Sequence, residues 1–203
     1  MSGELQQEKN GGSALLIIDM INDFKHEDGP ALFEHALPAA HAIARVKKRA
    51  VDERVPVIYV NDNFQEWRAS FEATIERVEN RSGEGRQMVE LLKPGGRDYY
   101  VLKPHRSGFY KTPLGLLLDH LNTSHLVLTG ITTDTCVLQT CHEAHIRGYQ
   151  MFVPSDCTAA ARIEYHKQAL DMIERTTDAG VGESDEIQFR NAPSDQKSAV
   201  ISR

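Results

Sequence analysis

The stretch LVLTGITTDTC, residues 126–136, ends in a cysteine whose position favours chemistry. Its first half is an apolar run rich in β-branched residues, its middle is a glycine turn, and an amphipathic segment follows. This order predicts a strand, a tight loop and a helix that begins near Cys136. Unpaired N–H groups and the positive end of the helix dipole stabilise a thiolate there, so Cys136 is our candidate nucleophile.

Asp19 and Lys103 are the other two candidate groups, because each directly follows a predicted strand. The apolar run of residues 14–18 ends at Asp19, and the run of residues 99–102 ends at Lys103. Parallel strands bring their carboxyl ends to one edge of a sheet, where open α/β sheets hold their ligands. We therefore expect Asp19, Lys103 and Cys136 to meet, although they are far apart in the sequence.

A carboxylate, an ammonium and a thiol at one point are the groups needed to split an amide through a thioester. The charge of Lys103 favours the thiolate of Cys136, while Asp19 takes the thiol proton and later delivers it to a leaving amine. The oxyanion formed on the way needs two preorganised N–H donors, which we assign to Thr132 and Cys136. Taken singly, each side chain also has an ordinary structural role as a strand-end cap, a surface charge or an apolar core residue.

The elements that must position these groups alternate along the chain. We predict strands over residues 14–18, 56–60, 99–102, 125–129 and 150–153, with a weak last strand over residues 178–181. We predict helices over residues 39–53, 69–78, 86–92, 114–121, 134–147 and 162–175. Residues 20–33 read as a loop, and Pro38 opens the first helix. The alternation favours a three-layer α/β/α fold, a doubly wound, mostly parallel, Rossmann-like sheet.

The length and composition of the chain fit a single domain with one hydrophobic core. We place it at residues 14–190, between flexible polar tails over residues 1–13 and 191–203. The net charge of −6 comes from 23 basic and 29 acidic residues without a basic stripe, which argues against a nucleic-acid partner.

The lack of a targeting signal and the spacing of the cysteines indicate where the protein is located and whether its cysteines form disulfides. There is neither an apolar run of the roughly 20 residues that a membrane span needs nor a signal-peptide core, so we expect a cytoplasmic protein without a membrane partner. The three cysteines include no Cys-x-x-Cys pair, which argues against a disulfide framework and a structural zinc site.

Three motifs in this order resemble a known family, the isochorismatase-like cysteine hydrolases. They are ALLIIDMINDF around Asp19, VLKPHRSGF around Lys103 and LTGITTDTCV around Cys136, and the likeness covers about residues 15–160. The family includes nicotinamidases and N-carbamoyl amide hydrolases, and its members are usually oligomers. The resemblance implies an isochorismatase-like fold, an amidase activity, a small-molecule substrate and a homo-oligomer.

Site roles also follow from the resemblance. It implies that Asp19, Lys103 and Cys136 form a catalytic triad and that the Ile131–Thr132 peptide is cis. The amides of Thr132 and Cys136 would then form the oxyanion hole.

The segment after the second predicted strand departs from the nicotinamidase pattern. Nicotinamidases of this family typically carry an Asp-x-His motif there, with a further histidine, and hold a metal that binds the pyridine nitrogen. This chain has Asp62, Asn63 and Phe64 instead, and no histidine lies between His41 and His105. Because a metal site needs several convergent ligands, we predict neither a metal nor another cofactor, and nicotinamide fits less well as a substrate.

We therefore predict a metal-independent cysteine hydrolase that cleaves an amide or ureido C–N bond of a small molecule. Isochorismate-cleaving members of the family do not depend on a nucleophilic cysteine, so Cys136 favours C–N chemistry. The alternatives are an isochorismatase-type hydrolase of another small metabolite and a non-catalytic, metabolite-binding member of the fold. A flavodoxin-like or nucleotide-binding domain is disfavoured, because the chain has neither G-x-G-x-x-G nor a P-loop.

The loops at the same edge should choose the substrate. We predict substrate contacts from Phe24, Asn63, Trp67 and Phe109, and we place Arg106 and Tyr110 in the same loops. Loop aromatics also commonly anchor a loop to the core, which is the alternative for these rings. His142 and His145, three residues apart on a predicted helix, are better explained by a surface or subunit contact than by a metal.

Overall fold

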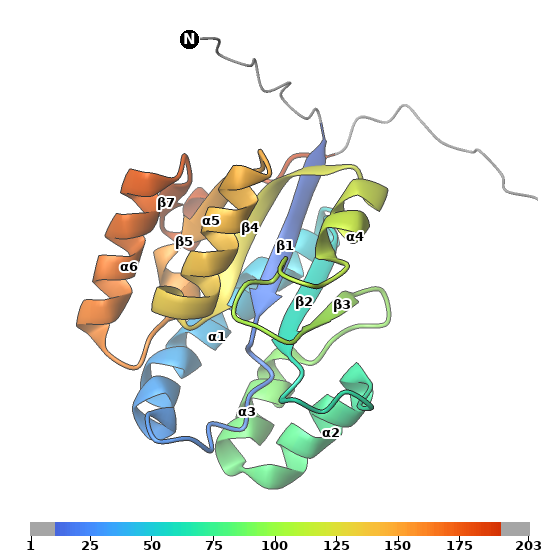
Figure 1. Cartoon of the computed structure of the whole chain (residues 1–203), viewed down its shortest axis with the longest axis vertical. Helices are drawn as coiled ribbons and strands as arrows, with labels where there is room; N and C mark the ends of the chain where they lie inside the picture. Colours follow the sequence, from blue (N-terminus) through green and yellow to red (C-terminus); the bar gives the residue numbers. More distant parts are fainter. Residues whose placement is uncertain (1–10, 192–203) are drawn as a thin grey trace, which may run out of the picture.

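The computed structural model describes residues 11–191 and contains one parallel sheet with helices on both faces (Figure 1). Six strands follow the order β3-β2-β1-β4-β5-β7, and β6 pairs with the end of β4. The strands are β1 Gly12–Ile18, β2 Val57–Asp62, β3 Tyr99–Lys103, β4 Thr123–Ile131, β5 Gln150–Pro154, β6 Thr158–Ala159 and β7 Gly180–Gly182. The predicted doubly wound α/β fold is confirmed.

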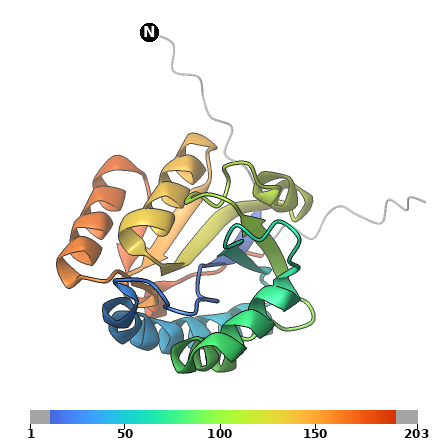
Figure 2. The same cartoon turned by 60° about the horizontal axis from the view of Figure 1, so that its bottom comes forward.

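The helices form the two outer layers, as Figure 2 shows from the end at which β1 stops. They are α1 Gly29–Asp52, α2 Phe71–Arg81, α3 Gly83–Leu92, α4 Leu114–His120, α5 Leu138–Ile146 and α6 Ile163–Thr176. Short segments complete the chain: a π-helical turn η1 Thr133–Val137 and the 3-10 turns η2 Ser155–Cys157 and η3 Ser184–Glu186. Within residues 11–191, no helix combines the length and apolar character that crossing a membrane requires.

The central strand β1 explains why the core has two layers. Its side chains alternate between the faces, so Leu15 and Ile17 pack with the α1, α2 and α3 side, while Leu16 and Ile18 pack with the α4, α5 and α6 side. All four are fully buried. A strand covered on both faces is apolar throughout, which is why residues 14–18 read as a continuous run.

The ends of the chain fall partly outside the described residues. β1 begins at Gly12, so residues 12 and 13 of the predicted N-terminal tail belong to the sheet. The rest of the predicted tails, residues 1–10 and 192–203, lies outside the described part of the chain.

The first helix is longer than the sequence predicted. The predicted loop over residues 20–33 is wrong from Gly29 onward, because α1 starts there with Pro30 in its first turn. Pro38 lies inside α1 rather than before it, although an interior proline usually costs about 3 kcal/mol. Pro38 is exposed, and a buried stripe runs past it along the helix through Leu32, Ala36, Ala40, Ile43 and Val46. Burial of that stripe offsets the lost hydrogen bond.

The strand order reverses between β1 and β4, which makes their carboxyl ends a topological switch point, the usual place for a ligand. The two strands approach closely there, since Ile18 pairs with Gly130. Gly130 has a φ of +115°, and a Cβ atom on it would lie 2.0 Å from the Ile18 carbonyl oxygen. Only glycine fits this position.

Candidate active site

Asp19, Lys103 and Cys136 meet at the carboxyl edge of the sheet. The Nζ atom of Lys103 lies 2.8 Å from Oδ2 of Asp19 and 3.5 Å from Sγ of Cys136. Lys103 is fully buried, Asp19 is 7% exposed, and Cys136 is partly exposed. The structure thus brings together the three side chains that the sequence placed after separate strands.

The Asp19 carboxylate is fixed through both of its oxygens. Oδ2 pairs with Lys103, while Oδ1 accepts a hydrogen bond of 2.7 Å from the backbone N–H of Asp62 at the end of β2. The backbone of Asp19 has a φ of +54°, a left-handed conformation that is uncommon for residues other than glycine. Such conformations gather at functional sites, where the surrounding structure holds them.

The Lys103 ammonium has three partners for its three N–H donors. Besides Asp19 and Cys136, it donates to the carbonyl oxygen of His105 at 3.1 Å. A buried charge with its donors satisfied in this way is held in place rather than free to move.

Burial and charge act against each other in this pair. Burial raises the pKa of Asp19 above its ordinary value, although the positive charge of Lys103 opposes the rise. Burial by itself would lower the pKa of Lys103, but the negative charges of Asp19, Cys136 and Asp62 and the hydrogen bond to Asp19 together outweigh it and leave that pKa raised. Lys103 therefore stays protonated at neutral pH, and the Asp19 carboxylate is a stronger base than an exposed one.

The thiol of Cys136 differs from the sequence-based expectation of a stabilised thiolate. Burial and the negative charge of Asp19 raise its pKa to about 12, and the positive charge of Lys103 only partly offsets them. Asp19 also accepts a hydrogen bond from the thiol, which favours the protonated form. The free protein therefore holds a neutral thiol next to a base that can take its proton.

The turn before Cys136 has an unusual backbone. The Ile131–Thr132 peptide is cis, which confirms the expectation from the family resemblance. The predicted helix over residues 134–147 begins instead as the π-helical turn η1 and becomes α-helical at Leu138. The backbone N–H groups of Thr135 and Val137, on either side of Cys136, both donate to the Thr132 carbonyl oxygen at 3.1 Å.

The loop after β3 is fastened to α5, and this fixes Cys136 relative to Lys103. The Thr140 hydroxyl donates to the carbonyl oxygen of Cys136 at 2.6 Å and accepts from the Gly108 N–H at 3.0 Å. The Ser107 hydroxyl donates to the Glu143 carboxylate at 2.5 Å. Thr140 is thus a positioning residue that sequence reasoning missed.

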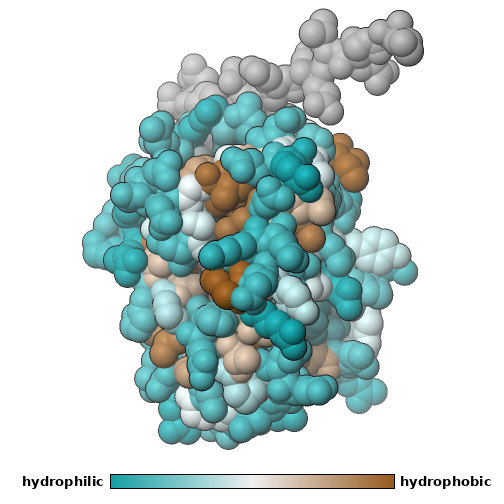
Figure 3. Space-filling view, turned by 90° about the vertical axis from the view of Figure 1, so that its left-hand side faces the viewer, coloured by the Kyte–Doolittle hydropathy of each residue, from teal (hydrophilic) through white to brown (hydrophobic). Residues whose placement is uncertain are grey.

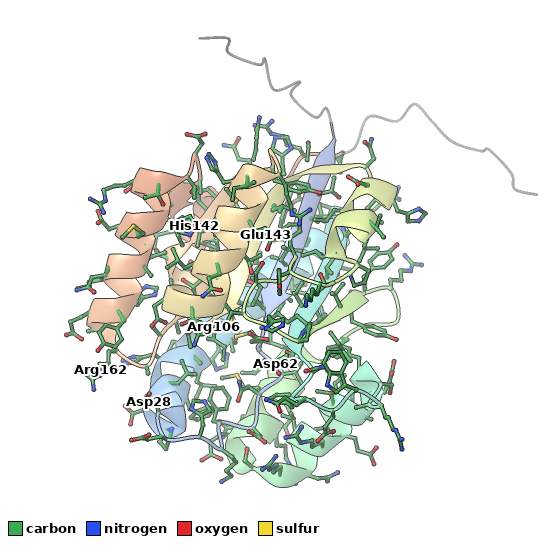
Figure 4. All side chains as sticks on the ribbon, viewed as in Figure 1. Asp28, Asp62, Arg106, His142, Glu143 and Arg162 are labelled. Carbon is green, nitrogen blue, oxygen red and sulfur yellow. The ribbon has the colours of Figure 1, made fainter. Side chains whose placement is uncertain are left out.

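A surface cavity of about 990 Å³ adjoins these groups, between the loop after β3 and α5. One part of its lining is next to the three side chains: Asp62 bonds to Asp19, and Gln139 lies one turn after Cys136. The rest is lined by Pro104, His105, Arg106, Ser107, Tyr110, His142, Glu143, Ile146 and Arg147. Figure 4 shows Asp62 and Arg106 near the strand ends and His142 and Glu143 further along α5.

Of the α5 residues that line this cavity, His142 was assigned from the sequence to a surface or subunit contact, and Gln139, Glu143 and Ile146 were not identified. Gln139 and Glu143 lie four residues apart, which places polar side chains on one helix face, and this spacing was the available signal. Arg147 pairs with Glu143 at 2.6 Å, so the charges at the far end of the cavity are partly satisfied within α5.

The two predicted substrate-contacting phenylalanines lie in the core. Phe24 is 4% exposed and packs edge-on against Phe33 with ring centroids 5.3 Å apart, while Phe109 is 3% exposed and stacks on Tyr149 at 5.7 Å. Neither lines the 990 Å³ cavity. These positions favour the alternative that both rings anchor their loops.

Asn63 and Trp67 also lie off that cavity. Asn63 is buried, and its side-chain oxygen accepts from the Gln65 N–H at 2.9 Å, so it shapes the turn after β2. Trp67 is 78% exposed. Their roles as substrate contacts remain predictions.

The two histidines of α5 contact different groups of the chain itself. Nε2 of His142 lies 2.8 Å from the Thr176 hydroxyl, and Nδ1 of His145 lies 3.8 Å from the Asp178 carboxylate. Asp62, in the segment where nicotinamidases have metal ligands, accepts a hydrogen bond from the Phe64 N–H. Across the described residues, no group of three or more His, Cys, Asp or Glu side chains is arranged to hold a metal ion.

Comparison with known proteins matches residues 13–183 to the isochorismatase domain. The isochorismatase family protein YaaI of Bacillus subtilis is 33% identical over 174 residues, which cover 86% of this chain and 95% of that protein. The ureidoacrylate amidohydrolase RutB of Cronobacter sakazakii is 39% identical over 83 residues, 41% of this chain and 36% of that protein. The crystal structure of N-carbamoylsarcosine amidase from Thermoplasma acidophilum superposes with a TM-score of 0.67 at 30% identity, covering 87% of this chain and 98% of that one.

Proposed function

The chain belongs to the isochorismatase family, and from that premise we propose that it hydrolyses a small amide or ureido compound with Cys136 as nucleophile. The observation that carries the proposal is the contact of three side chains from three strand ends. Lys103 lies 2.8 Å from Asp19 and 3.5 Å from Cys136, in a largely buried group. A buried ammonium, carboxylate and thiol are costly to assemble, and amide cleavage uses all three.

In the first half of the reaction, Asp19 removes the thiol proton as Sγ of Cys136 attacks the carbonyl carbon. Lys103 stabilises the developing thiolate. The carbonyl oxygen becomes an oxyanion that accepts hydrogen bonds from the amides of Thr132 and Cys136. When the C–N bond breaks, the protonated Asp19 gives its proton to the leaving nitrogen.

In the second half, Asp19 takes a proton from water as the water oxygen attacks the covalent intermediate. An amide substrate leaves a thioester on Cys136, and a ureido substrate leaves a thiocarbamate. The C–S bond then breaks, and the proton held by Asp19 returns to the Cys136 sulfur. The raised pKa of the thiol supports this order, since a base is needed to remove the proton.

For the substrate, we propose the ureido class, with the part that does not react lying in the 990 Å³ cavity. Two similar proteins support this choice, because their names specify a ureidoacrylate and an N-carbamoylsarcosine substrate. Arg106 lines the cavity and is our candidate for polar recognition there. The substrate contact of Asn63 remains a prediction, and we propose no metal. A cytoplasmic location and a homo-oligomer remain predictions.

The test measures ammonia release from a panel of primary amides, ureido acids, N-carbamoyl amino acids and nicotinamide. We expect hydrolysis by the wild-type chain, none by Cys136→Ala, and retained hydrolysis by Cys141→Ala, which removes a thiol without a neighbouring acid. Equal release by wild type and Cys136→Ala would remove the nucleophile assignment. Saturable binding of a panel member without any release would favour the non-catalytic alternative.

A further inference from the structure

A second cavity lies between α1 and α6, next to the 3-10 turn η2 and strand β6, and has a volume of about 300 Å³. Figures 1 and 2 both show α1 and α6 beginning at the same end of the molecule, and Figure 4 labels Asp28 and Arg162 there. Figure 3 looks onto the side that carries α6, where hydrophobic side chains lie in a band among polar ones. The cavity has an apolar wall that includes Ala39, Ala42 and Ala160.

One polar side chain that lines this cavity has no hydrogen-bond partner among the described residues. Thr158 lines the cavity and is 4% exposed, and its hydroxyl oxygen is buried without a hydrogen-bond partner among residues 11–191. Most buried hydroxyl groups in proteins are hydrogen-bonded. A ligand with an acceptor atom would satisfy this one.

The start of α6 points to the charge of such a ligand. Arg162, the N-cap residue, makes no side-chain capping bond, and Ile163 in the first turn lines the cavity. The N–H groups of an uncapped first turn and the positive end of the helix dipole favour an anion.

The charged groups around the cavity agree with an anion. Arg45, His35 and His166 line it, and the one carboxylate in the lining is that of Asp156. The Asp156 oxygens already accept hydrogen bonds from the backbone N–H and the hydroxyl of Ser184, at 2.9 and 2.6 Å. That carboxylate is therefore engaged. Among the lining groups, Arg45 is the permanent positive charge and donates to the His41 carbonyl oxygen at 3.3 Å through one of its nitrogens. Burial lowers the pKa of His166, so its ring is a neutral hydrogen-bonding group at neutral pH.

We propose that this cavity binds a small organic carboxylate. Its carboxylate group accepts hydrogen bonds from the Thr158 hydroxyl and from the first-turn amides of α6, and Arg45 supplies positive charge at the mouth. Its apolar part lies against Ala39, Ala42 and Ala160. A volume of about 300 Å³ is at the lower end of the range of small-molecule sites, which limits the ligand to a compact metabolite.

The same cavity reaches the turn that holds the proposed oxyanion donors. His166 lines the cavity, and its Nδ1 atom lies 2.9 Å from the hydroxyl oxygen of Thr133, the first residue of η1. Thr133 directly follows Thr132. A ligand in contact with His166 therefore changes the hydrolysis rate, and this second step rests on the proposed function, whereas the binding step does not.

Binding is tested by titrating the 15N-labelled full chain with butyrate and benzoate, with butan-1-ol and benzyl alcohol as neutral controls. We expect saturable shifts at the amides of Thr158 and residues 163–166 with the carboxylates alone. Thr158→Val should weaken binding about fivefold, the equivalent of one hydrogen bond. It should not lower the Tm of the free protein, because the hydroxyl has no partner to lose. Ala39→Leu, which fills the cavity, should abolish binding.

Three results would overturn the binding site: equal binding of the alcohols, unchanged affinity in Thr158→Val, or shifts confined to other parts of the molecule. If Ala39→Leu fails to fold, Thr158→Val still decides the matter. For the second step, benzoate should change kcat at saturating substrate in the wild type and not in Thr158→Val. Binding with an unchanged kcat would overturn the coupling, and intact binding in a chain without hydrolase activity would count against the proposed function alone.

Discussion

Cys136 and Cys141 lie on successive turns after β4, and both thiols have a pKa raised to about 12, yet their surroundings differ. Burial alone raises the pKa of Cys141, which packs in the apolar layer beside α4 and α6. Cys136 owes part of its raised pKa to Asp19, and it has the Lys103 ammonium at 3.5 Å. The comparison teaches that a nucleophile is distinguished by the base and cation beside it, and not by the resting pKa of its thiol.

The strongest way to break this comparison is to remove the base. Asp19→Asn should lower kcat about 10²- to 10⁴-fold, the usual contribution of a positioned general base. The same change should speed alkylation of Cys136, because the negative charge that raises the thiol pKa is gone while Lys103 remains.

The control for that change is Asp98→Asn, which removes a buried carboxylate paired with Lys47 at 2.8 Å, away from the thiol. It should leave kcat and the alkylation rate unchanged. If Asp19→Asn lowers hydrolysis and alkylation together, Asp19 is only a structural group.

Removing the cation should have the next largest effect. Lys103→Met should lower kcat about 10²- to 10³-fold, as loss of one preorganised electrostatic group does. It should also destabilise the protein by about 3–5 kcal/mol, because it leaves the Asp19 carboxylate buried and unpaired. Activity and Tm are both measured.

Lys47→Met is the matched control for Lys103→Met. Lys47 is held by Asp98 and by the Tyr59 hydroxyl, both at 2.8 Å, so its loss should lower Tm with kcat retained in the folded protein. Equal losses of kcat in the two variants would show that Lys103 acts through stability alone.

A smaller effect is expected on the order in which the three cysteines are alkylated, because their thiols differ in solvent exposure. Iodoacetamide should label Cys136 before Cys141 and Cys157, because Cys136 is partly exposed while the other two are fully buried. Lys103→Met should slow labelling of Cys136, since loss of the positive charge raises the thiol pKa further. Peptide mapping measures the order, and even labelling of the three thiols would contradict it.

The smallest expected effect is on the pH profile. Asp19 must be ionised to accept the thiol proton, and burial raises its pKa above the ordinary 3.8. Activity should therefore fall with decreasing pH at values above 3.8, and the acid limb of kcat/KM reports this titration for the coupled group. Cys141→Ala should keep the same limb. A limb at or below 3.8 would mean that another group limits the rate.

The sequence was sufficient to predict that Asp19, Lys103 and Cys136 meet, because strand ends are visible in it. Apolar runs end at Asp19 and Lys103, and parallel strands finish at a shared edge. The start of α1 was predicted too late because Pro38 was taken to open the helix. A local rule for proline does not include the free energy gained by burying the apolar stripe of α1, which offsets one lost hydrogen bond. The raised pKa of Cys136 could not be predicted from the sequence, because it depends on how deeply the thiol is buried and on its distance to Asp19.

The residues that line the cavity were harder to predict than the contact between Asp19, Lys103 and Cys136. Phe24 and Phe109 looked like pocket walls from their loops, but both rings point into the core. Gln139 and Glu143 line the cavity together with the loop after β3, which is joined to α5 by hydrogen bonds of Thr140 and Ser107. Contacts of this kind join distant segments through side chains and have no periodic signature.

The central claim is that Cys136, and not Cys141, forms a covalent bond to the substrate. The most direct test quenches the enzyme in acid during turnover of a hydrolysed panel compound and measures the mass of each cysteine peptide. The account predicts an added acyl or carbamoyl mass on the Cys136 peptide, with no addition on the peptide of Cys141. Steady ammonia release without any adduct on Cys136, and equal release by Cys136→Ala, would contradict it.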